Sequence, residues 1–170
     1  MFHKGDPVVH PGYGAGIVDE IKALEFLGNK RKRYYAIHLL AEPETTVMVP
    51  VRDEDKVGLR PPLPQSRLKR IWRVLRSDPD KLPKDHKKRH AQLTEKLYDA
   101  SAVEVAEVLR DLAWRRERRN RFTIRGRRLY ERSLDLLAGE VASTQGTDVS
   151  DAKIKISDVL DRSLAENGDD

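Results

Sequence analysis

Three prolines within four positions divide this chain into two parts that fold differently. They lie in the segment Pro61-Pro62-Leu63-Pro64. Proline fixes its own φ and lacks a backbone N–H, so this segment cannot continue a central strand and forms a stiff, extended linker. About sixty residues are enough for a small core. We therefore expect two domains, residues 1–62 and residues 63–170.

The part before the prolines has the pattern of short strands separated by tight turns. The predicted strands cover residues 8–9, 17–26, 32–40 and 45–49, and Pro50 ends the last of them. A glycine-rich turn at 12–16 follows the first strand, and a hairpin turn at 28–30 follows the second. Short strands with close turns indicate a small curled sheet or barrel.

The part after the prolines has apolar residues at helical spacing. The first helix carries Leu68, Ile71, Trp72 and Leu75, at i, i+3, i+4 and i+7. A second helix begins after Pro83-Lys84-Asp85. A Ser101…Glu104 capping box opens a third, which breaks between 120 and 123. A fourth helix follows, and an acidic one covers 150–165. The expected fold class is thus α+β, multi-domain: a small β domain followed by an all-α bundle of about five helices.

The charge of the chain is concentrated in its middle. Residues 61–135 hold 21 Lys and Arg against 11 Asp and Glu, a net charge of +10. Residues 1–60 hold 9 of each kind, whereas residues 136–170 hold 3 Lys and Arg against 8 Asp and Glu, a net charge of −5. A strongly basic segment between neutral and acidic ones is typical of a phosphate-binding surface. The acidic last helix is expected to pack on the bundle and to shield the basic face from non-specific DNA.

Three basic clusters lie near expected helix ends, at 87–90, 115–121 and 125–128. One cluster alone is usually a solvated helix face, but three in one basic segment favour contact with phosphates. Arginine predominates in the last two, which suits bidentate phosphate binding. The expected DNA-binding residues are His86, Lys87, Lys88, Arg89, His90, Arg119, Arg121, Arg125 and Arg128. No base-reading signature is visible, so sequence-specific recognition is not expected.

Catalytic and metal-binding patterns are weak in this sequence. It has no cysteine, no phosphate loop and no Gly-x-Ser-x-Gly motif, so we expect no enzyme, cofactor or metal. His86 and His90 lie four apart, but the basic residues between them would repel a cation, and DNA contact is the better interpretation. Trp72 and Trp114 lie on apolar helix stripes and are expected in the core. No apolar run is long enough for a membrane span.

Several segments, in order along nearly the whole chain, resemble the CarD/CdnL family of bacterial transcription regulators. They are GDPVVHPGYGAG at 5–16, VMVP at 47–50, VGLR at 57–60 and AEVLRDL at 106–112. The resemblance implies a Tudor-like domain that docks on the β subunit of bacterial RNA polymerase. The matching positions for that contact are Val47, Met48, Val49 and Pro50. Some members carry Arg where this chain has Met48, so an apolar contact is expected here in place of a salt bridge.

The resemblance further implies that the helical domain contacts promoter DNA at the upstream edge of the transcription bubble. There it would stabilise the open complex together with the housekeeping sigma factor. The family usually has a tryptophan wedge at the start of the second helix of this domain. An ungapped alignment places His86 at that position, and a histidine offers less apolar area for insertion. The expected protein is a cytoplasmic monomer.

A second interpretation remains open from the sequence. The chain could be a general nucleic-acid-binding or architectural protein that acts without polymerase and whose β domain binds RNA or a peptide. The affinity for isolated duplex DNA and its salt dependence discriminate between the two. Tight binding without polymerase favours the architectural protein, and weak, strongly salt-dependent binding favours the tethered regulator.

Overall fold

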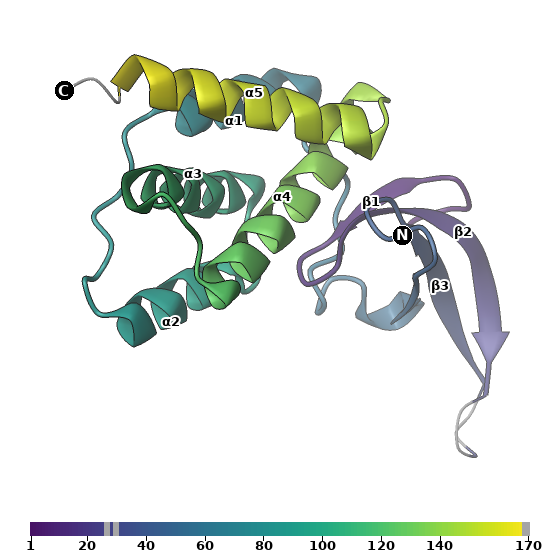
Figure 1. Cartoon of the computed structure of the whole chain (residues 1–170). Coiled ribbons are helices and arrows are strands. Elements are labelled where there is room, and N and C mark those ends of the chain that lie inside the picture. Colours follow the sequence, from purple (N-terminus) through teal and green to yellow (C-terminus); the bar gives the residue numbers. More distant parts are fainter. Residues whose placement is uncertain (26–27, 29–30, 168–170) are drawn as a thin grey trace.

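The computed structural model describes residues 1–25, 28 and 31–167, which form a four-stranded sheet followed by five α-helices (Figure 1). The strands are β1 (Pro7–His10), β2 (Gly14–Leu24), β3 (Lys32–Leu39) and β4 (Thr46–Pro50). They pair antiparallel in the order β1-β2-β3-β4, which leaves β1 and β4 at opposite edges of an open sheet. The expected α+β class is confirmed.

The second strand begins earlier than the sequence predicted. Gly14, Ala15 and Gly16 pair with β1, so the tight turn covers only the residues between His10 and Gly14. The close approach of β3 explains the glycine at 16. A Cβ added there would lie 2.6 Å from Ile37 Cγ2 and 2.7 Å from the carbonyl oxygen of His38. The predicted strand end at Phe26 and the predicted turn residues Asn29 and Lys30 lie outside the described residues.

One face of the sheet carries the core of the β part. The core residues are Val8, Val18, Tyr35, Ile37, Leu39, Val49 and Leu59. A bulge between Val18 and Glu20 inserts one extra residue into β2. Because of this extra residue, the side chain of Ile21 lies on the same core face of the sheet as that of Val18. The Tyr35 hydroxyl donates a 2.5 Å hydrogen bond to Glu54, which follows a short 3-10 helix at Val51–Asp53.

The helices are α1 (Leu68–Arg76), α2 (His86–Leu97), α3 (Ala102–Arg119), α4 (Ile124–Gln145) and α5 (Val149–Asn167), and a 3-10 turn at Gln65–Arg67 precedes α1. Local capping fixes their starts. The Asp85 side chain accepts from the Lys88 amide, and the predicted capping box of Ser101 and Glu104 is present. Asn120 ends α3 in the left-handed region, with φ of 51°.

The helical core is formed by the apolar stripes that the spacing predicted. Leu68, Ile71 and Leu75 of α1 pack with residues of α3, α4 and α5 in one buried cluster. Trp114 is buried, as expected for a core residue. Trp72 is only partly buried, and the Lys155 ammonium lies 4.8 Å from its ring centroid.

The two parts of the chain are packed together through α4, which runs from the helical core to the sheet (Figure 1). Gly139 of α4 is buried against Ala15 of β2. A Cβ added at Gly139 would lie 3.4 Å from the Cβ of Ala15, in van der Waals contact. The proline segment is tied down as well, because the Leu63 carbonyl accepts a 2.8 Å hydrogen bond from Thr144 of α4. This segment was expected as a linker, and it lies along α4. That residues 1–62 and 63–170 fold as separate domains stays a prediction.

Candidate nucleic-acid interface and sheet edge

The start of α2, the end of α3 and the start of α4 meet around a hollow of about 750 Å³. We call it the basic hollow. Its charged and ionisable lining residues are Lys84, Asp85, His86, Lys87, Arg89, His90, Arg115, Arg119, Arg121 and Arg125. Asp85 is the one carboxylate among these lining residues, and its side chain accepts from the Lys88 amide at the start of α2. The hollow is therefore a concentration of positive charge with little internal neutralisation.

The floor of the hollow is apolar. Leu93 and Leu112 are buried and pack together, and Phe122 and Leu129 pack against the same small cluster. Phe122 lies 5.1 Å from Tyr130, measured between ring centroids. A low-dielectric floor strengthens the field of the cations above it, because fewer water molecules screen them.

Arg115 shows how closely the cations are crowded. Partial burial, and then the neighbouring charges of Arg89 and Arg119, lower the pKa of the Arg115 guanidinium from its ordinary value. The arginine remains charged at neutral pH, since its ordinary pKa is far above 7. The mutual repulsion is relieved when an anion enters, so the arrangement favours phosphate binding.

Seven of the predicted DNA-binding residues line this hollow. They are His86, Lys87, Arg89, His90, Arg119, Arg121 and Arg125. Lys88 and Arg128 are exposed but do not line the hollow. Three clusters that are separate in the sequence are thus brought to one place by the packing of three helix ends.

Arg89 differs from its expected role as an exposed phosphate contact. Its residue exposure is only 8 %, and its Nη1 donates to the carbonyl oxygens of Pro83 and Lys84 at 2.9 and 3.0 Å. The guanidinium is therefore bound to the chain just before α2. Arg89 adds charge to the hollow, but its contacts make it a structural residue.

Two cationic lining residues were not among the predicted set, Lys84 and Arg115. Arg115 lies one helical turn before Arg119, so the i, i+4 relation within α3 was a usable signal. Lys84 precedes the α2 cap, and only the path of the chain before α2 brings it to the hollow.

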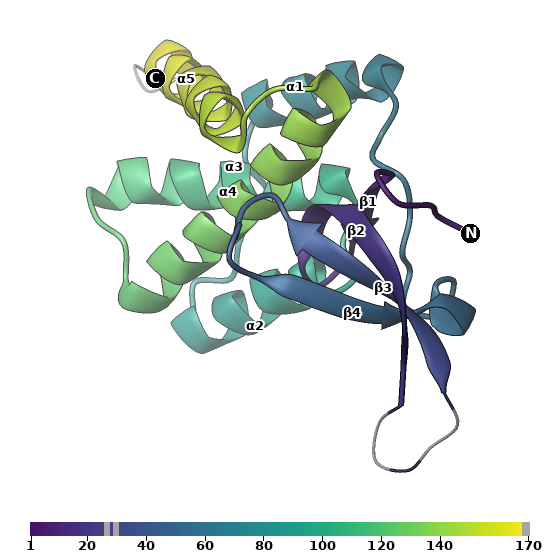
Figure 2. The same cartoon turned by 90° about the vertical axis from the view of Figure 1, so that its right-hand side faces the viewer.

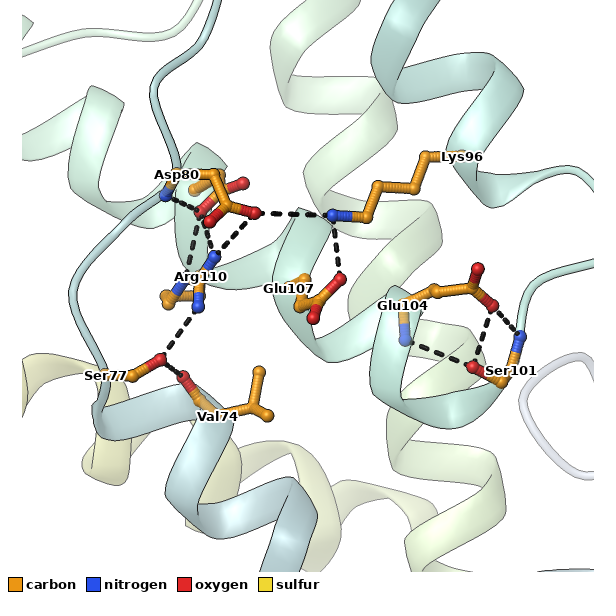
Figure 3. A network of polar contacts seen from close by, with 9 residues as sticks. Val74, Ser77, Asp80, Lys96, Ser101, Glu104, Glu107 and Arg110 are labelled. Atoms are coloured by element: carbon orange, nitrogen blue, oxygen red, sulfur yellow. Dashed lines mark hydrogen bonds and ion pairs between the residues drawn. The ribbon is translucent and has the colours of Figure 1, made fainter.

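A polar network around the buried Arg110 and Asp111 holds the segment between α1 and α2 against α3 (Figure 3). The backbone N–H of Asp80 donates to Asp111 at 3.0 Å, and Arg110 binds both Asp111 and Asp80 at 2.8 and 3.2 Å. Lys96 of α2 pairs with Glu107 of α3 at 2.7 Å. Burial raises the pKa of the Asp111 carboxyl, although these hydrogen bonds and Arg110 oppose the shift. The network fixes the position of α2, and with it one wall of the hollow.

The acidic helix α5 does not cover the basic hollow. It packs on α4, α1 and α3, and it lies at the end of the helical part opposite α2 (Figure 1). Arg116 of α3 pairs with its Asp161 at 3.5 Å. The expectation that α5 packs on the bundle is correct, but the expected shielding of the basic face is not supported by its position.

No group of three or more potential metal-ligating side chains occurs among the described residues. No helix among them is sufficiently long and apolar to cross a membrane.

The second candidate site is the free edge of the sheet at β4 (Figure 2). Within the described residues, β4 pairs with β3 alone. Val49 is buried opposite Tyr35, while Val47 is half-buried against the same core. Met48 alternates to the other face, opposite Ala36, and is half-buried. An open strand with unpaired outward backbone groups is a template for pairing with another chain.

Beside β4 lies a shallow hollow of about 360 Å³, lined by residues 45–50 together with His10, Tyr13 and Val57. Tyr13 is 50 % exposed and packs edge-on against His10, with 4.9 Å between ring centroids. Burial lowers the pKa of His10, so this imidazole is mainly neutral at pH 7. The surface next to β4 is thus mixed apolar and aromatic, with little charge.

An open strand edge in one part and a cationic hollow in the other are features of a nucleic-acid-associated regulator. The model of the CarD-like/TRCF RID domain matches residues 2–62, and that of the CarD C-terminal domain matches residues 70–157. The chain belongs to the CarD family, whose members are transcription regulators that act through RNA polymerase, and which is not a known enzyme family. The resemblance seen in the sequence is confirmed.

A curated relative extends the similarity over nearly the whole chain. The "Putative transcription factor YdeB" of Bacillus subtilis (strain 168) is 28 % identical over 155 residues. The aligned region covers 91 % of this chain and 98 % of that protein.

Proposed function

We propose that this protein tethers to the β subunit of RNA polymerase and stabilises the promoter open complex by contacting DNA at the upstream edge of the bubble. Residues 1–62 supply the polymerase contact and residues 63–170 the DNA contact. The observation that carries the proposal is the convergence of three basic clusters on one hollow, with a single carboxylate among the lining residues.

The polymerase contact is assigned to Val47, Met48, Val49 and Pro50 of β4. This strand is an edge of the sheet, so a strand of the partner can extend it by backbone hydrogen bonds. Met48 offers an apolar side chain on the face away from the β core, and the His10–Tyr13 pair widens this surface. The contact is therefore expected to be apolar and only weakly salt-dependent.

The DNA contact is assigned to the basic hollow. Arg119, Arg121 and Arg125 are exposed and suited to bidentate phosphate binding. His86 is exposed at the first position of α2, where the family resemblance places the wedge residue at the bubble edge. These contacts follow the backbone and the minor groove, so binding is largely independent of sequence.

The mechanism is a population shift. A tethered protein that binds melted promoter DNA more tightly than closed DNA favours the open state by that difference in affinity. The protein acts as a monomer in the cytoplasm, in one complex with polymerase, the housekeeping sigma factor and the promoter. The tether raises the local concentration of the hollow near DNA, so weak contacts are sufficient.

The lifetime of the promoter open complex tests the DNA contact. A variant with R119Q, R121Q and R125Q should shorten the lifetime toward the value without the protein while it still binds polymerase. A control with R31Q, K32Q and R33Q removes the same charge from exposed positions before and in β3. An equal effect of both variants, or an unchanged lifetime with the hollow variant, would contradict the assignment.

Binding to the β subunit tests the tether. M48D should lower the affinity at least about tenfold, since a desolvated charge costs more than 1.4 kcal/mol. A23D places the same charge at an exposed position of β2 and should have no effect. If M48D kept full activity and the chain bound bare duplex DNA tightly, the alternative architectural role would be favoured.

A further inference from the structure

Helix α1 carries a second basic surface that lies outside the hollow. Its exposed cations are Lys69, Arg70, Arg73 and Arg76. We define these four residues as the α1 basic face. We propose that this face binds the phosphate backbone of a DNA duplex, as a second DNA site that the basic hollow does not include.

The arrangement of α1 directs these cations outward. Leu68, Ile71 and Leu75 are at most 3 % exposed and hold the opposite side of the helix in the core. An α-helix turns by about 100° per residue, so the four cations fall within an arc of about 120° around the helix axis. The centre of this arc lies opposite the three buried apolar side chains. The α1 basic face is thus one continuous strip.

The α1 basic face has no counter-charge of its own. No acidic residue occurs in Leu68–Arg76, and none of the four cations forms an ion pair with a described residue. Like charges three and four positions apart, such as Lys69 and Arg73, repel each other on a helix. A polyanion laid along the strip removes this repulsion.

Two glutamates of α3 lie near one end of the strip. Glu104 and Glu107 share a shallow hollow with Arg67 and Arg70. Both carboxylates are already engaged, because Glu104 caps Ser101 and Glu107 pairs with Lys96 at 2.7 Å. Arg73 and Arg76, at the other end near the acidic helix α5, form no ion pair with a described residue.

The chemistry of the strip favours a duplex backbone over other partners. Protein interfaces have an apolar centre, and sites for single strands have exposed aromatic rings on which bases stack. The α1 basic face has neither, since Trp72 is partly buried and the ammonium of Lys155 lies over its ring. A strip of cations without exposed apolar groups suits phosphates, which both strands of a duplex present continuously.

The position of α1 makes this site independent of the hollow. Both views place α1 and α2 at opposite ends of the helical part, with α3 between them (Figures 1 and 2). One short, straight duplex cannot lie on both surfaces at once. One protein molecule therefore holds two separate duplex segments, or two turns of one bent duplex.

The test is the number of short duplexes that one full-length molecule binds. The probe is a DNA duplex of about 14 base pairs at low salt, where phosphate contacts are strongest. Native mass spectrometry or equilibrium ultracentrifugation should find two duplexes per wild-type chain and one per chain of the K69Q/R70Q/R73Q variant. The R31Q/K32Q/R33Q variant, with the same loss of charge, should still bind two.

The salt dependence gives a second readout. On a duplex long enough to bend, loss of three phosphate contacts should reduce the slope of log K against log salt by roughly two to three. The proposal is overturned if the α1 variant binds as many duplexes as wild type with an unchanged slope, or if a single strand binds this face as tightly as a duplex. A hollow variant that still binds two duplexes would contradict the hollow assignment and leave the α1 site standing.

Discussion

Arg60 and Glu140, eighty positions apart in the chain, form a bidentate ion pair across the boundary between the sheet and α4. The two hydrogen bonds measure 2.6 and 2.9 Å, and the same carboxylate accepts from the Leu63 N–H at 3.1 Å. Glu140 is only 4 % exposed. The buried Glu140 carboxylate thus binds Arg60, just before the proline segment, and Leu63, within that segment, to α4.

Replacing Glu140 should weaken this connection. E140A should lower the free energy of unfolding by about 2 kcal/mol, because it leaves Arg60 and the partly buried Leu63 N–H without their acceptor. The value is smaller than for a fully buried pair, since Arg60 is about one-third exposed and can rehydrate. Urea denaturation measures it, and E131A on the exposed side of α4 is the control. A double-mutant cycle with R60A that shows no coupling would contradict the role of the pair.

An alanine at position 16 should destabilise the β part. Its Cβ would lie within 2.7 Å of backbone and side-chain atoms of β3, so G16A should cost about 1–3 kcal/mol of overpacking. The matched control is G12A, whose Cβ would meet only the His10 ring, at 3.7 Å. Thermal unfolding of both variants checks the difference. Equal melting temperatures would show that β2 and β3 can separate without cost.

Glu54 should make the stability sensitive to acid. The hydrogen bond from Tyr35, and then the N-terminal amine 2.9 Å away, lower the pKa of this carboxyl below its ordinary 4.5. A lowered pKa in the folded state contributes stability above the unfolded pKa, and this is lost as pH falls through the folded pKa. Below pH 4.5, E54Q should therefore lose stability less steeply than wild type. Urea titrations at several pH values measure this, with the exposed E44Q as control.

Substitutions of Arg89 and Lys88 should differ in their effect on stability, because Arg89 is buried and hydrogen-bonded whereas Lys88 is exposed. R89Q should lower the free energy of unfolding by about 1.5–3 kcal/mol, because it removes charged hydrogen bonds to the two carbonyls before α2. K88Q leaves the fold intact, within about 0.5 kcal/mol, since its side chain is exposed. Circular dichroism during urea unfolding measures both. If R89Q and K88Q had equal free energies of unfolding, Arg89 would not have a structural role and would be assigned as an exposed phosphate contact instead.

Much of the local structure could be predicted from the sequence. The four strands, the five helices and the capping box of Ser101 and Glu104 depend on neighbours within a few positions, which the residue pattern shows directly. The apolar stripe of α1 and the break at Asn120 were accessible for the same reason. The start of β2 was missed, because Gly14 and Gly16 read as a turn until β1 and β3 supply partners.

The sequence by itself determined the order of the elements, the division at the prolines and the concentration of cations in the middle of the chain. Only the tertiary structure decided which cations share a hollow, which one is buried, and where the acidic helix lies. Arg89, Arg115 and Arg125 lie on three helices, and their approach depends on packing between segments far apart in the chain. Periodicity and capping act over one or two turns of helix, whereas such contacts depend on the shape of the whole core.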